Sequence, residues 1–129
     1  MSGPLLDRID LHVEVMRPPT SVLRCDDSVG ESSAVVAARV KSAWMIQMQR
    51  SGRCNARLDG EQLAVDCDAD DESWSLLENA AEQFNLSARA HQRVLRVART
   101  IADLAATEKL AAPHVAEALS LRCLDRRMN

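Results

Sequence analysis

The stretch "LSARAHQRVLRVARTIADL", residues 86–104, decides the fold. Ser87 is a typical helix N-cap, and the residues after it repeat apolar side chains at a spacing of three and four, which predicts an amphipathic helix packed on a core. On that core side we expect Ala90, Val94, Val97, Ala98, Ile101 and Ala105. On the opposite side we expect a solvated basic face of Arg89, Arg93, Arg96 and Arg99. Arg99 can pair there with Asp103, four residues further on.

Arg89 differs from the other three arginines because it falls in the first turn of the predicted helix. The helix dipole is positive there and disfavours a cation by a few tenths of a kcal/mol up to about 1 kcal/mol. A phosphate held between the free N–H groups and the guanidinium would compensate for this cost. From charge alone, a solvated arginine and an anion-binding arginine both remain open.

The sequence on either side predicts more helices. Ser32 or Ser33 can cap a helix that ends near Gly52, with Val36, Val40, Ala43 and Trp44 on one face. A short helix is expected around residues 61–65. The next begins in the acidic cluster 68–72, ends at Asn85 and carries the stripe Trp74, Leu77, Ala81 and Phe84. A last helix spans 111–121, with Pro113 in its first turn. The fold class is therefore all-α, a bundle of about four helices.

The first 30 residues have a different character. Residues 9–15 alternate Ile9, Leu11, Val13 and Val15 with polar side chains, the pattern of a half-buried strand. Residues 16–31 contain two prolines and read as a linker. We expect residues 1–30 to form a terminal strand and linker, and residues 31–129 to form a helical domain. A lone strand has no sheet to pair with in this chain, so we expect it to be unpaired or disordered.

Composition excludes several classes of protein. The 129 residues are 47% hydrophobic and carry a net charge of −3, which suits one small domain and argues against a free-standing nucleic-acid binder. With neither a long apolar run nor a signal-peptide pattern, we expect a cytoplasmic protein without a membrane span. The cysteines at 25, 54, 67 and 123 lack metal-binding spacing. The acidic run 66–70 lacks the later ligands of a calcium loop, so we expect no metal site.

Four segments together resemble one family. "SGPLLDRIDLHVEV" at residues 2–15, "GESSA" at 30–34, "FNLSARAHQRVLRVARTIADL" at 84–104 and the "HVAEAL" to "LDR" ending are similar to the C-terminal part of the magnesium-chelatase-like AAA+ ATPases of the ComM/YifB group. The resemblance runs nearly end to end. It implies that the helical domain is the AAA+ lid, which follows the last strand of the ATPase core.

The resemblance also implies a role for two arginines. Arg8 matches the arginine finger, which acts on the nucleotide of the neighbouring subunit, and Arg89 matches the sensor-2 residue, which contacts the γ-phosphate of ATP. Guanidinium groups suit both roles because negative charge gathers on the γ-phosphate during transfer. The parent protein would use ATP and magnesium in a homo-oligomeric ring, with six subunits expected. Helicase or branch-migration work on DNA during recombination or transformation is implied as well.

The chain departs from a complete ATPase in one respect. It has no Gly-x-x-x-x-Gly-Lys-Ser/Thr phosphate loop and no acidic strand end for magnesium, so we expect no activity from this chain alone and a partner in the N-terminal AAA+ core. Trp44-Met45-Ile46 replaces a stretch that is usually charged in the family, through local repacking or as a contact face for that core. The alternative function is a helical DNA- or protein-binding module that uses the Arg93, Arg96 and Arg99 face.

Overall fold

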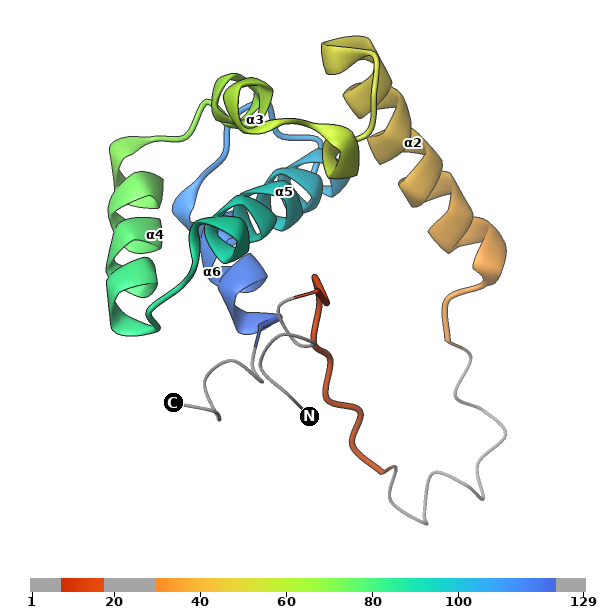
Figure 1. Ribbon diagram of the computed structural model, residues 1–129. Coiled ribbons are helices and arrows are strands. Elements are labelled where there is room, and N and C mark those ends of the chain that lie inside the picture. The colour runs from red at the N-terminus through yellow and green to blue at the C-terminus, as the bar shows by residue number, and fades with distance from the viewer. Residues whose placement is uncertain (1–7, 18–29, 123–129) are drawn as a thin grey trace.

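The helices of the chain gather around one central helix. The structure, a computed structural model, describes residues 8–17 and 30–122. In those ranges it contains the α-helices α2 (Ser33–Ser51), α3 (Gly60–Cys67), α4 (Asp71–Gln83), α5 (Ala88–Leu104) and α6 (Ala112–Ser120), with a short 3-10 helix, η2 (Asn55–Arg57). Figure 1 shows α5 in the middle, with α3, α4 and α6 around it and α2 to one side. The all-α prediction is confirmed.

The predicted helix boundaries follow from capping groups. The N-caps Ser32 and Ser87 accept hydrogen bonds from Val35 N–H and Ala90 N–H, at 3.4 and 3.1 Å. Asp70 caps α4 in the same way, accepting from Ser73 N–H at 2.7 Å. At the other end of α2, Gly52 adopts a φ of 66°, the left-handed conformation that stops a helix. These local signals confirm where α2, α4 and α5 begin and where α2 ends.

The core lies where α5 meets the three helices around it. Ala98 and Ala102 have no exposed surface, and their small side chains let the neighbouring helices come close to α5. Fully or almost fully buried residues come from α3, α4, the loop before α6 and α6 itself: Leu63, Cys67, Leu77, Leu110, Val115 and Ala118. The predicted core side of α5 is corrected in part, because Ala105 is exposed whereas Leu95 and Ala102 are buried.

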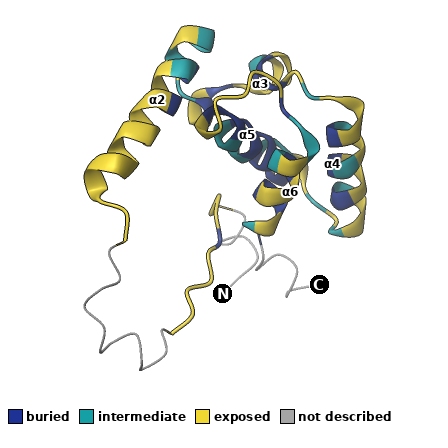
Figure 2. Cartoon of the chain, turned by 180° about the vertical axis from the view of Figure 1, so that it is seen from behind, coloured by how far each residue is buried: buried dark blue, intermediate teal, exposed yellow. Residues whose placement is uncertain are grey.

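The first half of α2 stands away from the bundle (Figure 2). Residues 31–42 are all exposed, and only Ala43 and Gln47 of this helix are buried. The apolar face expected from the sequence is mostly open to solvent, with exposed fractions of 39% for Val36, 55% for Val40 and 53% for Trp44. The other described parts of the chain leave this stripe uncovered.

The segment before the helices is extended but forms no regular strand within the described residues. One parallel bridge joins His12 to Arg122, in which His12 N–H donates to Leu121 C=O at 2.6 Å. As expected for a strand without its sheet, Ile9, Leu11, Val13 and Val15 are exposed, whereas His12 is buried. A single bridge to a chain end cannot bury a whole strand face. Most of the predicted linker, residues 18–29, lies outside the described residues.

No helix in the described part of the chain is long and apolar enough to cross a membrane.

Candidate functional site

The four arginines of α5 have different environments. Arg89 is exposed in the first turn, and no hydrogen bond or ion pair joins it to another described residue. Arg99 has no exposed surface and Arg93 retains 9%. Arg96 is half-buried and donates to Leu58 C=O from Nη2 at 2.8 Å. The predicted solvated basic face is therefore wrong for Arg93, Arg96 and Arg99, and only Arg89 presents a freely exposed guanidinium.

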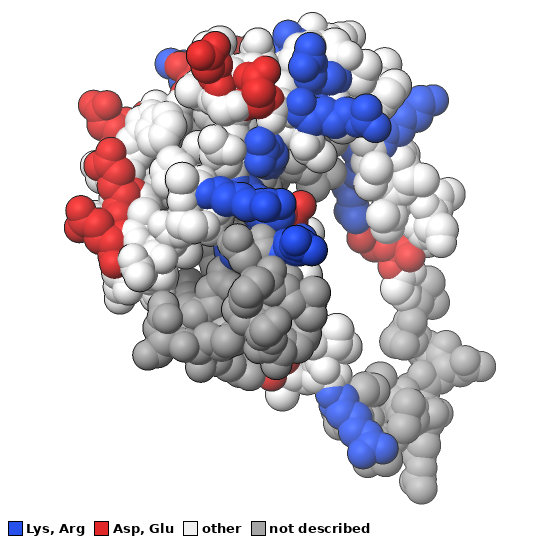
Figure 3. Space-filling model, in the orientation of Figure 1, with Lys and Arg blue, Asp and Glu red and all other residues white. Residues whose placement is uncertain are grey.

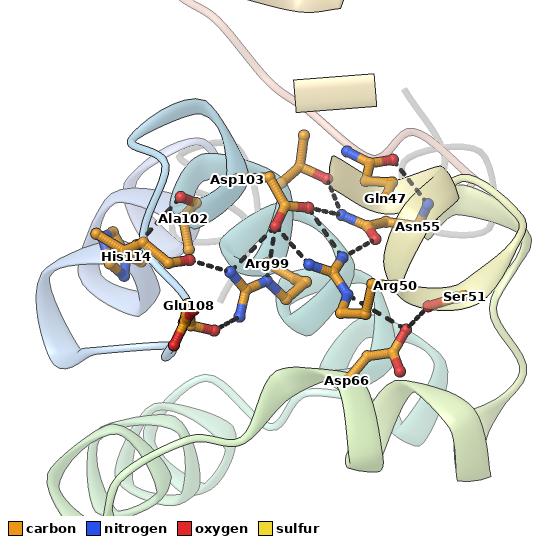
Figure 4. A network of polar contacts seen from close by, with 12 residues as sticks. Gln47, Arg50, Ser51, Asn55, Asp66, Arg99, Ala102, Asp103, Glu108 and His114 are labelled. Atoms are coloured by element: carbon orange, nitrogen blue, oxygen red, sulfur yellow. Dashed lines mark hydrogen bonds and ion pairs between the residues drawn. The ribbon is translucent and has the colours of Figure 1, made fainter. Parts of the chain in front are cut away.

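Asp103 lies at the centre of a network of polar contacts around the buried Arg99 side chain (Figure 4). Its carboxylate accepts from Arg99 Nε at 3.1 Å, which confirms the expected pair. It also accepts two hydrogen bonds from Arg50 of α2, at 2.7 and 3.0 Å. The remaining Arg99 donors bond the carbonyls of Thr107 and Glu108 at 2.6 and 2.7 Å. Every Arg99 nitrogen thus has an acceptor, which a buried guanidinium requires.

Asn55 extends the network to η2. Its Nδ2 donates to Asp103 at 2.8 Å and to the Thr100 hydroxyl at 3.0 Å, while its Oδ1 accepts from Arg50 at 2.8 Å. Asn55 N–H in turn donates to Gln47 Oε1 at 3.0 Å. Ser51 and Arg50 both contact Asp66 of α3. The network therefore fastens the C-terminal end of α2 to α3, η2 and α5.

Burial and charge act in opposite directions on Asp103. Burial raises the pKa of its carboxyl, but hydrogen bonds from Arg50 and Asn55 and the charge of Arg99 outweigh burial and hold that pKa below its ordinary value. The same contact with Asp103 raises the pKa of Arg50. Asp103 is therefore ionised at neutral pH, and its contacts with Arg50 and Arg99 join α2 to α5.

Arg89 borders an open cavity of about 670 Å³ beneath α5. One part of its lining is cationic and polar, with Arg89, Gln92, Arg93 and Arg96, and another part is apolar, with Val97, Ile101 and Leu104. Asp10 and Leu11 of the N-terminal segment complete one wall. Figure 3 shows acidic side chains over α4 at one side of the molecule and basic side chains toward its middle and opposite side. Glu117 also lines the cavity, so two acidic side chains, Asp10 and Glu117, stand there beside the three arginines.

Arg8 is exposed in the N-terminal segment and does not line this cavity. Asp10, two residues further on, does line it, and its Oδ1 lies 3.0 Å from Arg93 Nε. The structure thus brings the segment that carries Arg8 to the helix that carries Arg89, although it does not bring both arginines to one cavity. Sequence patterns gave no signal for the Asp10–Arg93 pair. They gave none for the contacts of Arg50 and Asn55 with Asp103 either, because the partners in each of these contacts lie tens of residues apart in the chain.

The residues around Arg89 suit part of a polyphosphate site. Guanidinium and amide donors bind phosphate oxygens well, and the apolar part of the cavity can take a flat ring. The cavity has no matching group of magnesium ligands. Within residues 8–17 and 30–122, no three acidic, histidine or cysteine side chains lie close enough together to bind a metal ion. Any magnesium that accompanies a nucleotide at Arg89 would need ligands from elsewhere.

The helical part of the chain matches a known family. The family model described as "Magnesium chelatase, subunit ChlI C-terminal" matches residues 30–122, which include every helix described above. The chain therefore belongs to the magnesium-chelatase-like C-terminal domain family.

Similarity to individual proteins places the chain in the ComM/YifB family. The chain is 42% identical over 126 residues to competence protein ComM of Haemophilus influenzae and 44% identical over 128 residues to the uncharacterised protein YifB of Salmonella typhimurium. An uncharacterised protein of Mycobacterium tuberculosis is 36% identical over 126 residues. These alignments cover 98%, 98% and 95% of this chain. The chain spans only 25% of the length of each of these relatives.

Proposed function

We propose that this chain is the helical lid of a larger, ring-forming AAA+ ATPase, and that Arg89 acts in that ATPase as the sensor-2 arginine. A lid covers the bound nucleotide and moves as ATP is hydrolysed, so an arginine that contacts the γ-phosphate links the chemical step to that movement. The core that binds ATP and magnesium belongs to the rest of the longer protein. The family match and the short share of each relative that the chain spans support this division.

The contrast among the α5 arginines is the observation that carries the proposal. Arg93, Arg96 and Arg99 are occupied by acceptors within the chain, whereas Arg89 keeps its donors exposed at the positive end of the helix. Among the described residues, no acidic side chain forms an ion pair with this cation. A triphosphate supplies the missing anion, and the planar guanidinium can bind it bidentately.

We assign Arg8 the second role, that of the arginine finger on the nucleotide of a neighbouring subunit. Its exposure leaves it available to another molecule. Assembly into a ring, with six subunits expected, follows from this role because a finger needs a neighbour. Work on DNA in recombination or transformation completes the proposal, and the competence protein among the relatives supports it.

The experiment is Arg89→Ala in the longer protein, assayed for ATP turnover at ATP concentrations well below KM, where the rate reports kcat/KM. We expect a drop of roughly 10- to 100-fold, because one charge-assisted contact to the transition state contributes about 1.5–3 kcal/mol. The matched control is Arg39→Ala, since Arg39 is also an exposed helical arginine, but in the first half of α2, which contributes no residue to the cavity. Equal turnover of the two variants would refute the sensor-2 assignment.

A further inference from the structure

One face of α2 is packed at its C-terminal end and open at its N-terminal end. Residues at spacings of four, three and four lie on this one side of the helix: Val36, Val40, Ala43 and Gln47. Ala43 and Gln47 are buried, and α2 packs against α5. Val36 and Val40 are exposed, in the half of α2 that stands away from the bundle (Figure 2). The same face therefore runs from a packed contact into solvent.

The bundle holds this open face in a fixed position. Arg50, near the C-terminal end of α2, donates two hydrogen bonds to Asp103 of α5, at 2.7 and 3.0 Å. Trp44, one helical turn after Val40, extends the apolar surface and is 53% exposed. We call Val36, Val40 and Trp44 the α2 stripe. An apolar stripe on a rigid helix is a surface that fits another protein surface.

We infer that the α2 stripe packs against the ATPase core of the neighbouring subunit in the ring. The inference rests on the proposed function, which supplies both the core and the ring. The chain spans only 25% of the length of its relatives, so most of the longer protein lies outside it and can provide the covering surface. The stripe belongs to residues 30–122, the part that matches the family model as one unit.

The core of the same subunit fits the stripe less well. In the proposed function, the lid moves relative to its own core as ATP is hydrolysed. If that core covered the stripe, each movement would return Val36, Val40 and Trp44 to water, which is unfavourable for apolar surface. A surface that moves together with the lid avoids this cost. The neighbouring subunit offers such a surface, because a ring needs a contact besides the Arg8 finger to hold its subunits together.

Pairing between two α2 stripes does not fit a ring either. The same patch on both subunits makes an isologous contact, which is two-fold and closes after two subunits. A larger ring needs a heterologous contact, in which the stripe meets a different surface. The isolated chain carries the stripe without that second surface, so it should sediment as a monomer. A dimer of the isolated chain that Val40→Asp dissolves would overturn the inference.

The second measurement is hydroxyl-radical footprinting of the longer protein with a non-hydrolysable ATP analogue, below and above the concentration at which it assembles. Trp44 and its neighbour Met45 should be oxidised several-fold more slowly in the ring than in the unassembled subunit. Val65 of α3, which is 72% exposed, serves as the reference within the same chain. Protection of Trp44 in the unassembled subunit would assign the cover to its own core, and no protection in the ring would leave the stripe without one. Either result would overturn the inference.

The third measurement compares Val40→Asp with the matched control Ala38→Asp. Ala38 is also exposed, but it lies about 200° around the helix from Val40. In sedimentation of the longer protein, Val40→Asp should raise the concentration for half-assembly by about 10-fold or more, because it places a charge within an apolar contact. Ala38→Asp should assemble like the wild type. Equal assembly of the two variants would overturn the inference, provided that the isolated chains unfold at similar temperatures, which thermal denaturation checks.

The inference and the proposed function fail in different ways. If Arg89→Ala keeps full turnover while Trp44 is protected in the ring, the sensor-2 assignment is wrong and the α2 contact holds. If Arg89→Ala loses turnover while Val40→Asp assembles normally, the sensor-2 assignment holds and the α2 contact is wrong. A longer protein that never assembles would overturn the ring and the α2 contact together.

Discussion

At the residue scale, burial divides chemically identical side chains into enclosed and exposed ones. Arg99 and Arg89 lie on one helix, ten residues apart, yet Arg99 is enclosed by carbonyls and Asp103 whereas Arg89 faces solvent. The sequence predicted the Arg99–Asp103 pair because that pair is local. It could not predict that Arg50 and Asn55 share the same carboxylate, since they lie 53 and 48 residues from Asp103. The predicted basic face failed for this reason.

Asp103→Asn should destabilise the chain by about 3 kcal/mol, because it leaves two guanidinium groups facing each other without a carboxylate. Urea denaturation at pH 7 measures this change. The control Glu82→Gln, at an exposed position of α4, should stay within about 0.5 kcal/mol of the wild type. A loss below about 1 kcal/mol in Asp103→Asn would show that the network is not stabilising.

The same carboxyl makes stability depend on pH. The folded-state pKa of Asp103 lies below its ordinary value, so its contribution is fully present above about pH 4 and is lost as the pH falls through the lower, folded-state pKa. Urea midpoints measured between pH 5 and pH 2 should therefore fall less steeply in Asp103→Asn than in the wild type. Parallel slopes would contradict the pairing.

At the element scale, helix positions were predictable and their packing was not. Capping residues such as Ser32, Ser87 and Gly52 act within a few residues, so they marked the ends of α2 and the start of α5 correctly. Whether a helix face is buried depends on which other part of the molecule packs against it. The sequence placed Val36, Val40 and Trp44 on one apolar face but could not say what covers that face, and all three are exposed among the described residues. An exposed apolar stripe of this kind is typical of a surface that packs against another domain or protein.

Substitutions should distinguish the exposed stripe of α2 from the core. Val40→Ala is expected to change the free energy of unfolding by less than about 0.5 kcal/mol, since Val40 is 55% exposed. Leu77→Ala removes a side chain with no exposed surface and should cost about 3 kcal/mol. Chemical denaturation of the isolated chain measures both. A cost above about 1 kcal/mol for Val40→Ala would mean that the stripe packs against the bundle in solution.

At the scale of the whole molecule, the proposed function makes the chain supply arginines to a nucleotide site whose other parts belong to the longer protein. Its sequence contains no phosphate loop, and the described residues gather no magnesium ligands. The isolated chain should therefore hydrolyse no ATP and bind it only weakly, through contacts that salt screens. A coupled-enzyme assay and isothermal titration at low and physiological salt check this. Turnover by a pure sample would contradict the assignment as a lid.

The most direct test of the central claim is how Arg89 discriminates ATP from ADP in the longer protein. Fluorescent nucleotide titrations compare the wild type with Arg89→Ala for both nucleotides. Because Arg89 contacts only the γ-phosphate in this account, the variant should bind ATP about 10- to 100-fold more weakly while its affinity for ADP changes by less than about twofold. Equal losses for ATP and ADP, or no loss for either, would contradict it.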